Sequence, residues 1–199
     1  MRIVLASKSP RRREILSMLG ISFEVISADA DERSDITEPT SLVTELALRK
    51  GRATRELLRA RGEWDEDTLI IASDTVVAVG GEILGKPQND ADAARMLSLL
   101  SDSTHEVISG VALLQGEREL GGFESTAVSF GHMTPEEIAW YVKSGEPADK
   151  AGAYAVQGLA SMWIKGLSGD YFNVVGLPVY RLGQLLATFT GKTLCDLSE

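Results

Sequence analysis

The chain has 199 residues, of which 44% are hydrophobic and 25% are charged, and its formal net charge is −9. This size and composition predict a single globular domain over residues 1–199, with room for two lobes around a cleft. The negative charge repels duplex DNA and RNA, which argues against a nucleic-acid-binding protein.

The cysteine content and the lengths of the apolar runs indicate in which cellular compartment the protein resides. Cys195 is the one cysteine of the chain, so an internal disulfide is excluded and a reducing compartment is favoured. The N-terminus gives no signal-peptide pattern, and no apolar run approaches the roughly 20 residues that cross a bilayer. We therefore expect a cytoplasmic protein with no membrane partner.

The first part of the chain alternates strands with helices. The apolar run at residues 2–6 predicts a buried strand, and a helix is expected over residues 10–19 with Ser9 as its N-cap. A second strand is expected over residues 22–27, and a long helix with an apolar stripe over residues 41–60.

The rest of the chain continues the alternation. Residues 69–79 are strongly apolar and interrupted only by Ser73-Asp74-Thr75, and Gly80-Gly81 predicts a tight turn. The further elements that we expect are a return strand from residue 83, strands over 106–115 and 123–130, helices over 89–100, 134–143 and 178–188, and short strand-like runs within 151–176. Alternating helices and strands predict an α/β fold.

Three arginines, Arg11 to Arg13, stand in the first turn of the first predicted helix. They are unfavourable there, because a helix N-terminus carries partial positive charge. A bound anion reverses that preference, since backbone N–H groups, the Ser7 and Ser9 hydroxyls and the guanidinium groups together form a phosphate site. A basic surface face is the alternative, and the segment has no Walker motif. We favour the phosphate site because it follows a strand and opens a helix.

Lys50 shares the apolar stripe of the long helix, because it follows Leu46 by four residues and Ala47 by three. A lysine in that position either extends its ammonium group to solvent along the stem or points into a cleft. The spacing alone leaves both alternatives open.

Asp74 interrupts an apolar segment, where a carboxylate is costly unless it is paired, metal-bound or at the edge of a cleft. A β-bulge or a strand end at Ser73-Asp74 is the alternative. Gly85-Lys86-Pro87-Gln88 follows the return strand and fixes the backbone on both sides of Lys86. This segment either is a plain turn or holds the Lys86 cation rigidly so that it faces a phosphate.

An acidic loop adds Asp29, Asp31 and Glu32. Mg²⁺ prefers a few carboxylate oxygens together with waters and substrate phosphates, so one of these acids with Asp74 would suffice. A solvated loop is the alternative for Asp29 and Asp31. Two histidines are too few for a zinc site, and we expect His105 to be structural.

Six segments, in this order and over essentially the whole chain, resemble the motifs of the Maf family. They are Ser7-Lys8-Ser9-Pro10-Arg11-Arg12, Ser73-Asp74-Thr75-Val76-Val77, Gly85-Lys86-Pro87-Gln88, the segment from His105 to Val111, the segment from Asp149 to Gly158, and the segment from Gly169 to Pro178. One such motif is weak, whereas all of them in order are specific.

The resemblance implies an α/β fold with an elongated mixed sheet flanked by helices and two lobes around a central cleft, similar in outline to inosine-triphosphate pyrophosphatases. It implies hydrolysis of a nucleoside triphosphate between the α- and β-phosphates, with Mg²⁺ or Mn²⁺ as the divalent metal. Glu32 and Asp74 would hold the metal, and Asp74 would take a proton from water. The residues implied in gripping the triphosphate are Ser7, Arg11, Arg12, Lys50 and Lys86, and Lys86 is also implied as a catalytic residue beside Asp74 and Glu32.

The resemblance also bears on specificity, because Arg11, Thr75 and Gln157 fit the group of the family that prefers dTTP and UTP over 7-methyl-GTP. A glutamine amide can pair with a pyrimidine edge as donor and acceptor, although Gln157 can also be a plain turn residue before Gly158. The family further suggests a homodimer. The rival function is a nucleotide-binding regulator of cell division with little turnover.

Overall fold

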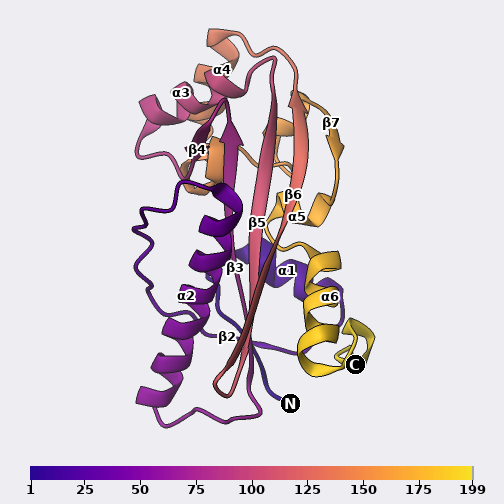
Figure 1. Cartoon of the computed structure of the whole chain (residues 1–199). Helices are drawn as coiled ribbons and strands as arrows, with labels where there is room; N and C mark the ends of the chain where they lie inside the picture. The colour runs from indigo at the N-terminus through magenta and orange to yellow at the C-terminus, as the bar shows by residue number, and fades with distance from the viewer. Residues whose placement is uncertain (199) are drawn as a thin grey trace.

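The structure, a computed structural model, describes residues 1–198 and is built on one open, mixed β-sheet (Figure 1). Its strands are β1 (Ile3–Leu5), β2 (Glu24–Val25), β3 (Leu69–Val79), β4 (Glu82–Leu84), β5 (Thr104–Gln115), β6 (Arg118–Phe130) and β7 (Ile164–Ser168). In space they follow the order β2-β1-β3-β5-β6-β7, and β4 pairs with β3 outside this path. β1 is parallel to β2 and β3, and the other pairs are antiparallel.

Six α-helices flank the sheet in the described residues, which confirms the predicted α/β class. They are α1 (Pro10–Met18), α2 (Pro39–Ala60), α3 (Asp90–Leu100), α4 (Pro135–Lys143), α5 (Tyr171–Val175) and α6 (Val179–Thr190). Helix α2 covers one face of the sheet, α1 and α6 lie on the other, and α3 and α4 gather at the end remote from both termini (Figure 1). Within residues 1–198 no helix is long and apolar enough to span a bilayer.

Most predicted boundaries agree with the structure, and the differences have physical reasons. The strand expected over residues 22–27 is reduced to the two residues of β2. Strand β6 begins at Arg118 rather than at residue 123, because it stays in register with β5 through two glycines, which sequence patterns count against a strand. The strand-like runs expected in 151–176 are mostly short 3-10 helices, η2 (Ala151–Ala153) and η3 (Leu159–Met162), besides β7 and α5.

Strand β3 runs without a break through the polar residues Ser73, Asp74 and Thr75. Its pairing with β5 keeps one register from Ile70 to Ala78, so the β-bulge considered from the sequence is wrong. Successive side chains in a strand point to opposite faces of the sheet. Ser73 and Thr75 therefore point to the α1 and α6 face, and Asp74 points to the α2 face.

The edge of β3 that faces away from β5 is only partly covered. β1 pairs with β3 as far as Leu5 and Ile71, and β4 pairs with it from Val77 onwards. Among residues 1–198 no strand pairs with residues 73–76 on this side. The polar part of β3 therefore faces an opening in the sheet instead of a neighbouring strand.

Helix α2 lies close against the sheet. A Cβ atom at Gly110 would lie 2.1 Å from the carbonyl oxygen of Val43, and one at Gly51 would lie 2.2 Å from Leu114 Cδ1. The helix can approach β5 to this distance only because both positions lack a side chain. This close approach brings Lys50, the residue next to Gly51, over β3.

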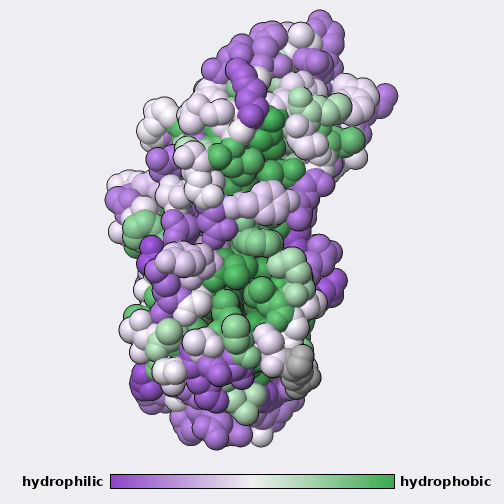
Figure 2. Space-filling view, turned by 90° about the vertical axis from the view of Figure 1, so that its right-hand side faces the viewer, coloured by the Kyte–Doolittle hydropathy of each residue, from purple (hydrophilic) through white to green (hydrophobic). Residues whose placement is uncertain are grey.

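The hydrophobic core forms separate clusters at the two ends of the sheet, and further clusters lie under α2. One cluster joins α3 and α4 to the sheet and includes Leu97, Phe130 and Tyr141, and another joins α1 and α6 to it and includes Leu16, Ile71 and Leu186. Figure 2 shows apolar surface on the face that carries β7, α5 and α6. A groove on this face is lined by Phe172, Val179, Tyr180 and Leu194.

Candidate active site

A cavity of about 480 Å³ lies where β3 faces the opening in the sheet. This volume is in the range of small-molecule sites. All nine residues predicted for the site line the cavity: Ser7, Arg11, Arg12, Glu32, Lys50, Asp74, Thr75, Lys86 and Gln157. The structure therefore brings together residues from the start, the middle and the last third of the chain.

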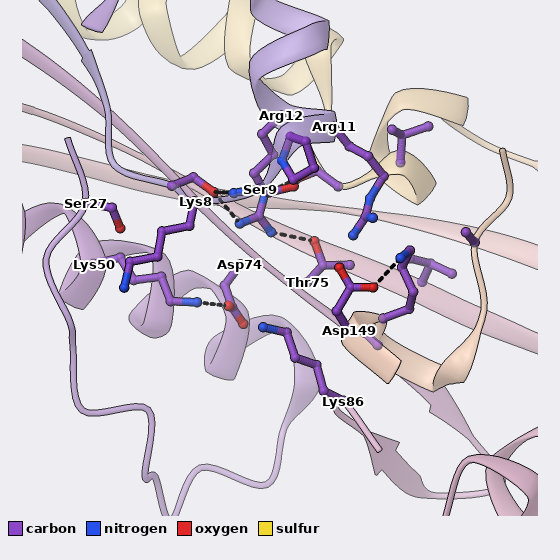
Figure 3. A pocket seen from close by; sticks show the side chains of 18 of the residues that line it. Lys8, Ser9, Arg11, Arg12, Ser27, Lys50, Asp74, Thr75, Lys86 and Asp149 are labelled. Carbon is purple, nitrogen blue, oxygen red and sulfur yellow. Dashed lines mark hydrogen bonds and ion pairs between the residues drawn. The ribbon is translucent and has the colours of Figure 1, made fainter. Parts of the chain in front are cut away.

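The loop between β1 and α1 forms one side of the cavity. Ser7 is buried, and its Oγ accepts hydrogen bonds from the backbone N–H of Ser9 and from Arg12 Nη1, each at 3.2 Å. Ser9 is the N-cap residue of α1 as predicted, although its side chain makes no capping hydrogen bond, and the first turn of the helix contains no acidic residue. Arg11 in that turn points into the cavity (Figure 3).

The Arg12 guanidinium is held by groups of the protein on several sides. Its Nε donates to the carbonyl oxygen of Gly176 at 2.7 Å, and its Nη2 donates to Thr75 Oγ1 at 3.1 Å. Ser73 Oγ donates to the same Gly176 carbonyl at 2.9 Å. Burial lowers the pKa of Arg12, and the charge of Asp74 opposes that effect. The fold thus fixes this cation at the cavity wall.

Behind Arg12, hydrogen bonds continue into the core. Thr75 Oγ1 lies 2.8 Å from Ser109 Oγ, and Ser109 Oγ donates to the carbonyl oxygen of Asn173 at 2.9 Å. Because the Ser109 proton goes to Asn173, Thr75 is the donor to Ser109. The sequence reasoning missed Ser109 and Asn173 as supports of the site. Ser109 interrupts an apolar strand as Asp74 does, so the same signal could have found it.

Lys50 links two carboxylates of the cavity. Its Nζ forms ion pairs with Asp74 Oδ1 and, at 2.8 Å, with Glu32 Oε1. Of the two alternatives for this lysine, the structure therefore shows the one in which it points into the cleft. The hydrogen bond from Lys50 lowers the pKa of Glu32, so this carboxylate is ionised at neutral pH.

The other acids of the loop are engaged elsewhere. Asp29 pairs with Lys8 at 2.8 Å, and Asp31 pairs with Arg33 at 3.0 Å. Residues 1–198 contain no cluster of three or more His, Cys, Asp or Glu side chains suited to a metal. Two hard carboxylates nevertheless fit Mg²⁺ or Mn²⁺, which complete their shell with waters and substrate phosphates. Glu32 is therefore the loop acid that the structure places with Asp74.

Three polar side chains that line the cavity have no protein partners. Arg11, Lys86 and Gln157 make no hydrogen bond or ion pair with any residue in the described part of the chain. Lys86 approaches Asp74 from the side opposite Lys50 (Figure 3). The loop that carries Lys86 is tied down, since the Gly85 carbonyl accepts the Gly152 N–H at 3.0 Å. Lys86 is thus an available cation on a fixed loop.

A buried pair closes the back of the cavity. Tyr154 lines the cavity, and its hydroxyl lies 2.8 Å from His105 Nε2. His105 is 2% exposed, and burial lowers its pKa to about 4. The structural role expected for His105 is confirmed.

The geometry suits one kind of chemistry. Arg11, Arg12 and Lys86 line the cavity and provide charge for a polyphosphate. Two adjacent carboxylates provide oxygen ligands for a hard metal and an acceptor for a proton. This combination is suited to hydrolysis of a phosphoanhydride.

Comparison with known proteins finds similarity over most of the chain, including the residues of the cavity. The sequence profile of the family described as "Maf-like protein" matches residues 2–189. A protein of Symbiobacterium thermophilum named dTTP/UTP pyrophosphatase is 47% identical over 188 residues, which cover 94% of this chain and 93% of that protein. Proteins with the same name from Moorella thermoacetica and Bacillus cereus are 46% and 42% identical over 191 and 189 residues, covering 94% of this chain and 95% of theirs.

Proposed function

Because the chain belongs to the family of Maf-like proteins, we propose that it is a nucleoside triphosphate pyrophosphatase that converts dTTP and UTP to the monophosphate and pyrophosphate. The observation that carries this proposal is the cavity in which available cations lie beside the Lys50-linked carboxylates of Glu32 and Asp74. Residues 1–199 would act as one domain, with the cytoplasm as its location and a homodimer as its assembly.

The triphosphate would be bound by two sets of cations. Arg11 and Lys86 have no partner among residues 1–198, so binding them to phosphate oxygens breaks no contact of the protein. Arg12 keeps its hydrogen bonds to Thr75 and Gly176 and presents a fixed charge. Fixed charges stabilise a developing negative charge well, because they need no reorganisation during the reaction.

Glu32 and Asp74 would hold the divalent metal. Mg²⁺ and Mn²⁺ both accept oxygen ligands, so the donor set suits either ion. When bound, the ion would supply electrostatic stabilisation of the phosphates and activation of a water. The ammonium group of Lys50 keeps the two carboxylates together, and it lowers the pKa of Glu32, so that this carboxylate is an ionised oxygen ligand.

Asp74 would accept the proton of the attacking water. The oxygen of that water forms a bond to phosphorus, the P–O bond between the α- and β-phosphates breaks, and pyrophosphate leaves. Asp74 is buried within β3, and Lys50 holds its carboxylate in the cavity, so its position is set before substrate arrives. Lys86 and Arg12 would offset the charge that builds on the leaving group.

Gln157 would read the base. It is exposed at the cavity and makes no side-chain hydrogen bond with residues 1–198, so its amide is available to a pyrimidine edge. Modified pyrimidine triphosphates, such as 5-methyl-UTP or pseudo-UTP, share that edge. The Thr75 hydroxyl is engaged by Arg12 and Ser109, so its contribution to substrate binding goes through the Arg12 guanidinium.

The proposal is tested by pyrophosphate release from a panel of nucleoside triphosphates, with Mg²⁺ or Mn²⁺, for the wild type and Asp74→Asn. We expect release from dTTP and UTP, and a decrease of roughly 10²-fold or more in the variant, because it lacks the proton acceptor. A preference for 7-methyl-GTP would overturn the roles of Arg11, Thr75 and Gln157. Nucleotide binding without release of pyrophosphate would favour the regulator instead.

A further inference from the structure

The turn that carries Gln157 has no helix or strand of its own, so something else must hold it at the cavity. Residues 154–158 lie between η2 and η3. On the side of the turn away from the cavity lies Tyr141 of α4, which is fully buried. Its hydroxyl donates a hydrogen bond to Glu146 Oε1 at 2.7 Å. We call these two residues the Tyr141–Glu146 pair.

The pair contacts the backbone of the turn both before and after Gln157. The Tyr141 hydroxyl accepts the N–H of Ala155 at 3.4 Å, and Glu146 Oε2 accepts the N–H of Leu159 at 3.0 Å. Each of these N–H groups lies two residues from Gln157. The pair therefore fixes the two ends of the short segment whose centre faces the cavity.

Gly158 shows how tightly the carboxylate packs against the turn. A Cβ atom at this position would lie 2.2 Å from Glu146 Oε1, so only glycine leaves room for the carboxylate. The Gly158 N–H closes the turn by donating to the Ala155 carbonyl at 3.2 Å. The backbone carbonyl oxygen of Glu146 also accepts a hydrogen bond from Lys150 Nζ at 3.3 Å. Because Lys150 lines the cavity, this bond ties a second part of the cavity wall to the same residue.

The Tyr141 hydroxyl stays protonated at neutral pH. Burial and the hydrogen bond to Glu146 raise the pKa of Tyr141, so the hydroxyl keeps its proton and remains a donor. Neither Tyr141 nor Glu146 lines the cavity. Their effect on a bound nucleotide is therefore indirect and passes through the turn.

We propose that Tyr141 and Glu146 are positioning residues for nucleobase recognition, because they hold the turn that places Gln157 at the base. This inference rests on the proposed function and on Gln157 as the reader of the base. It goes beyond both by assigning part of the specificity to two residues outside the cavity. Loosening the turn then weakens base discrimination and leaves the phosphate chemistry unchanged.

The first test compares Tyr141→Phe with the wild type in pyrophosphate release from dTTP and dATP. The variant keeps the ring and removes both hydrogen bonds of the hydroxyl. We expect KM for dTTP to rise, kcat to change less than about twofold, and the preference for dTTP over dATP to fall about fivefold to tenfold, the usual effect of a lost hydrogen bond. Tyr180→Phe is the matched control, because that side chain is 72% exposed and its hydroxyl has no partner among residues 1–198.

A double-mutant cycle separates positioning from general loss of structure. In a Gln157→Ala background, Tyr141→Phe should change the dTTP preference by less than about twofold, because the group that it positions is gone. An equal loss in both backgrounds would overturn the proposal. Glu146→Gln keeps the volume of the side chain and should lower the same preference for dTTP. Thermal unfolding of each variant tests whether it is folded.

The outcomes distinguish this inference from the proposed function. Equal loss of activity with dTTP and dATP in both Tyr141→Phe and Glu146→Gln would refute the positioning role and leave the pyrophosphatase in place. Absence of pyrophosphate release from the wild type would refute the proposed pyrophosphatase function. In that case the same comparison is made on the Kd for dTTP and dATP, and an unchanged ratio of the two Kd values refutes the positioning role.

Discussion

The polar side chains of the cavity fall into two groups that differ in how their hydrogen-bonding and charged atoms are satisfied. In one group, which we call the anchored wall wherever its members lie, Arg12, Lys50 and Asp74 are held by hydrogen bonds or ion pairs to the protein. In the other group, which we call the open wall, Arg11, Lys86 and Gln157 have no such partner within residues 1–198. Both walls carry cations, so charge alone does not distinguish them.

The difference indicates a division of labour. The free energy of ordering the anchored wall is part of folding, so its groups are in place before a ligand arrives. The groups of the open wall are satisfied by solvent and exchange it for a ligand. Changes in the anchored wall should therefore affect both activity and the stability of the fold, whereas changes in the open wall should affect activity without lowering the stability of the fold.

The largest expected effect is that of Lys50→Met. The variant keeps the stem of the side chain but leaves the carboxylates of Glu32 and Asp74 adjacent without their shared cation. We expect kcat/KM for dTTP to fall by roughly 10²- to 10³-fold, the size of effect seen when one charged or polar group of a catalytic site is removed. Lys8→Met is the control, because this lysine also lines the cavity but is 72% exposed and pairs only with Asp29.

A decrease of less than about tenfold in Lys50→Met, or an equal decrease in Lys8→Met, would remove the distinction between the walls. Thermal unfolding measured beside activity shows whether the lost ion pairs also destabilise the fold, as they should in an anchored wall.

The second effect concerns stability and comes from the pair behind the cavity. The pKa of His105 in the folded chain is about 4, below its ordinary value of 6.5, so the unfolded chain binds the proton more tightly. This group therefore leaves stability unchanged above pH 6.5 and lowers it as the pH falls towards 4, by about 3 kcal/mol in all. Urea unfolding at pH 7 and pH 4.5 measures the loss.

In His105→Gln we expect that part of the acid sensitivity to disappear, because glutamine does not titrate. His132→Gln is the control, since His132 is exposed and pairs with Asp102. An identical pH dependence in the wild type and His105→Gln would show that acid unfolding is governed by carboxylates alone and not by the buried imidazole.

The smallest effect is expected in the open wall. Lys86→Met removes a cation that has no partner among residues 1–198, so the melting temperature should not decrease. We expect kcat/KM for dTTP to fall about tenfold, with a weaker dependence on salt, because one charge contact to phosphate is lost. A melting temperature several degrees lower would place Lys86 among the anchored groups.

Much of the site was visible in the sequence, because its residues break local rules. Arginines in the first turn of α1 and a carboxylate within the apolar strand β3 are unfavourable without a ligand or partner. The ordered motifs then brought nine residues together, and the structure places all nine at one cavity. Residues of this kind are predictable because the feature that reveals them is local.

Features that depend on distant contacts could not be predicted. The opening beside β3 arises because β1 ends and β4 begins at different points along it, which no local pattern encodes. The continuous course of β3 through Asp74 depends on its pairing with β5. Tyr141 and Glu146 follow an ordinary helical pattern, so nothing in the sequence marks them as supports of the cavity.

The close contact between α2 and β5 has a consequence for how this chain can fail. The separation between the helix that carries Lys50 and the strand that carries Asp74 depends on two absent methyl groups, at Gly51 and Gly110. A mutation that adds a side chain at either glycine would push the helix outward and separate the reacting groups, although every one of them is still present. Inherited or engineered inactivity in this chain can therefore arise from a residue that has no chemistry of its own.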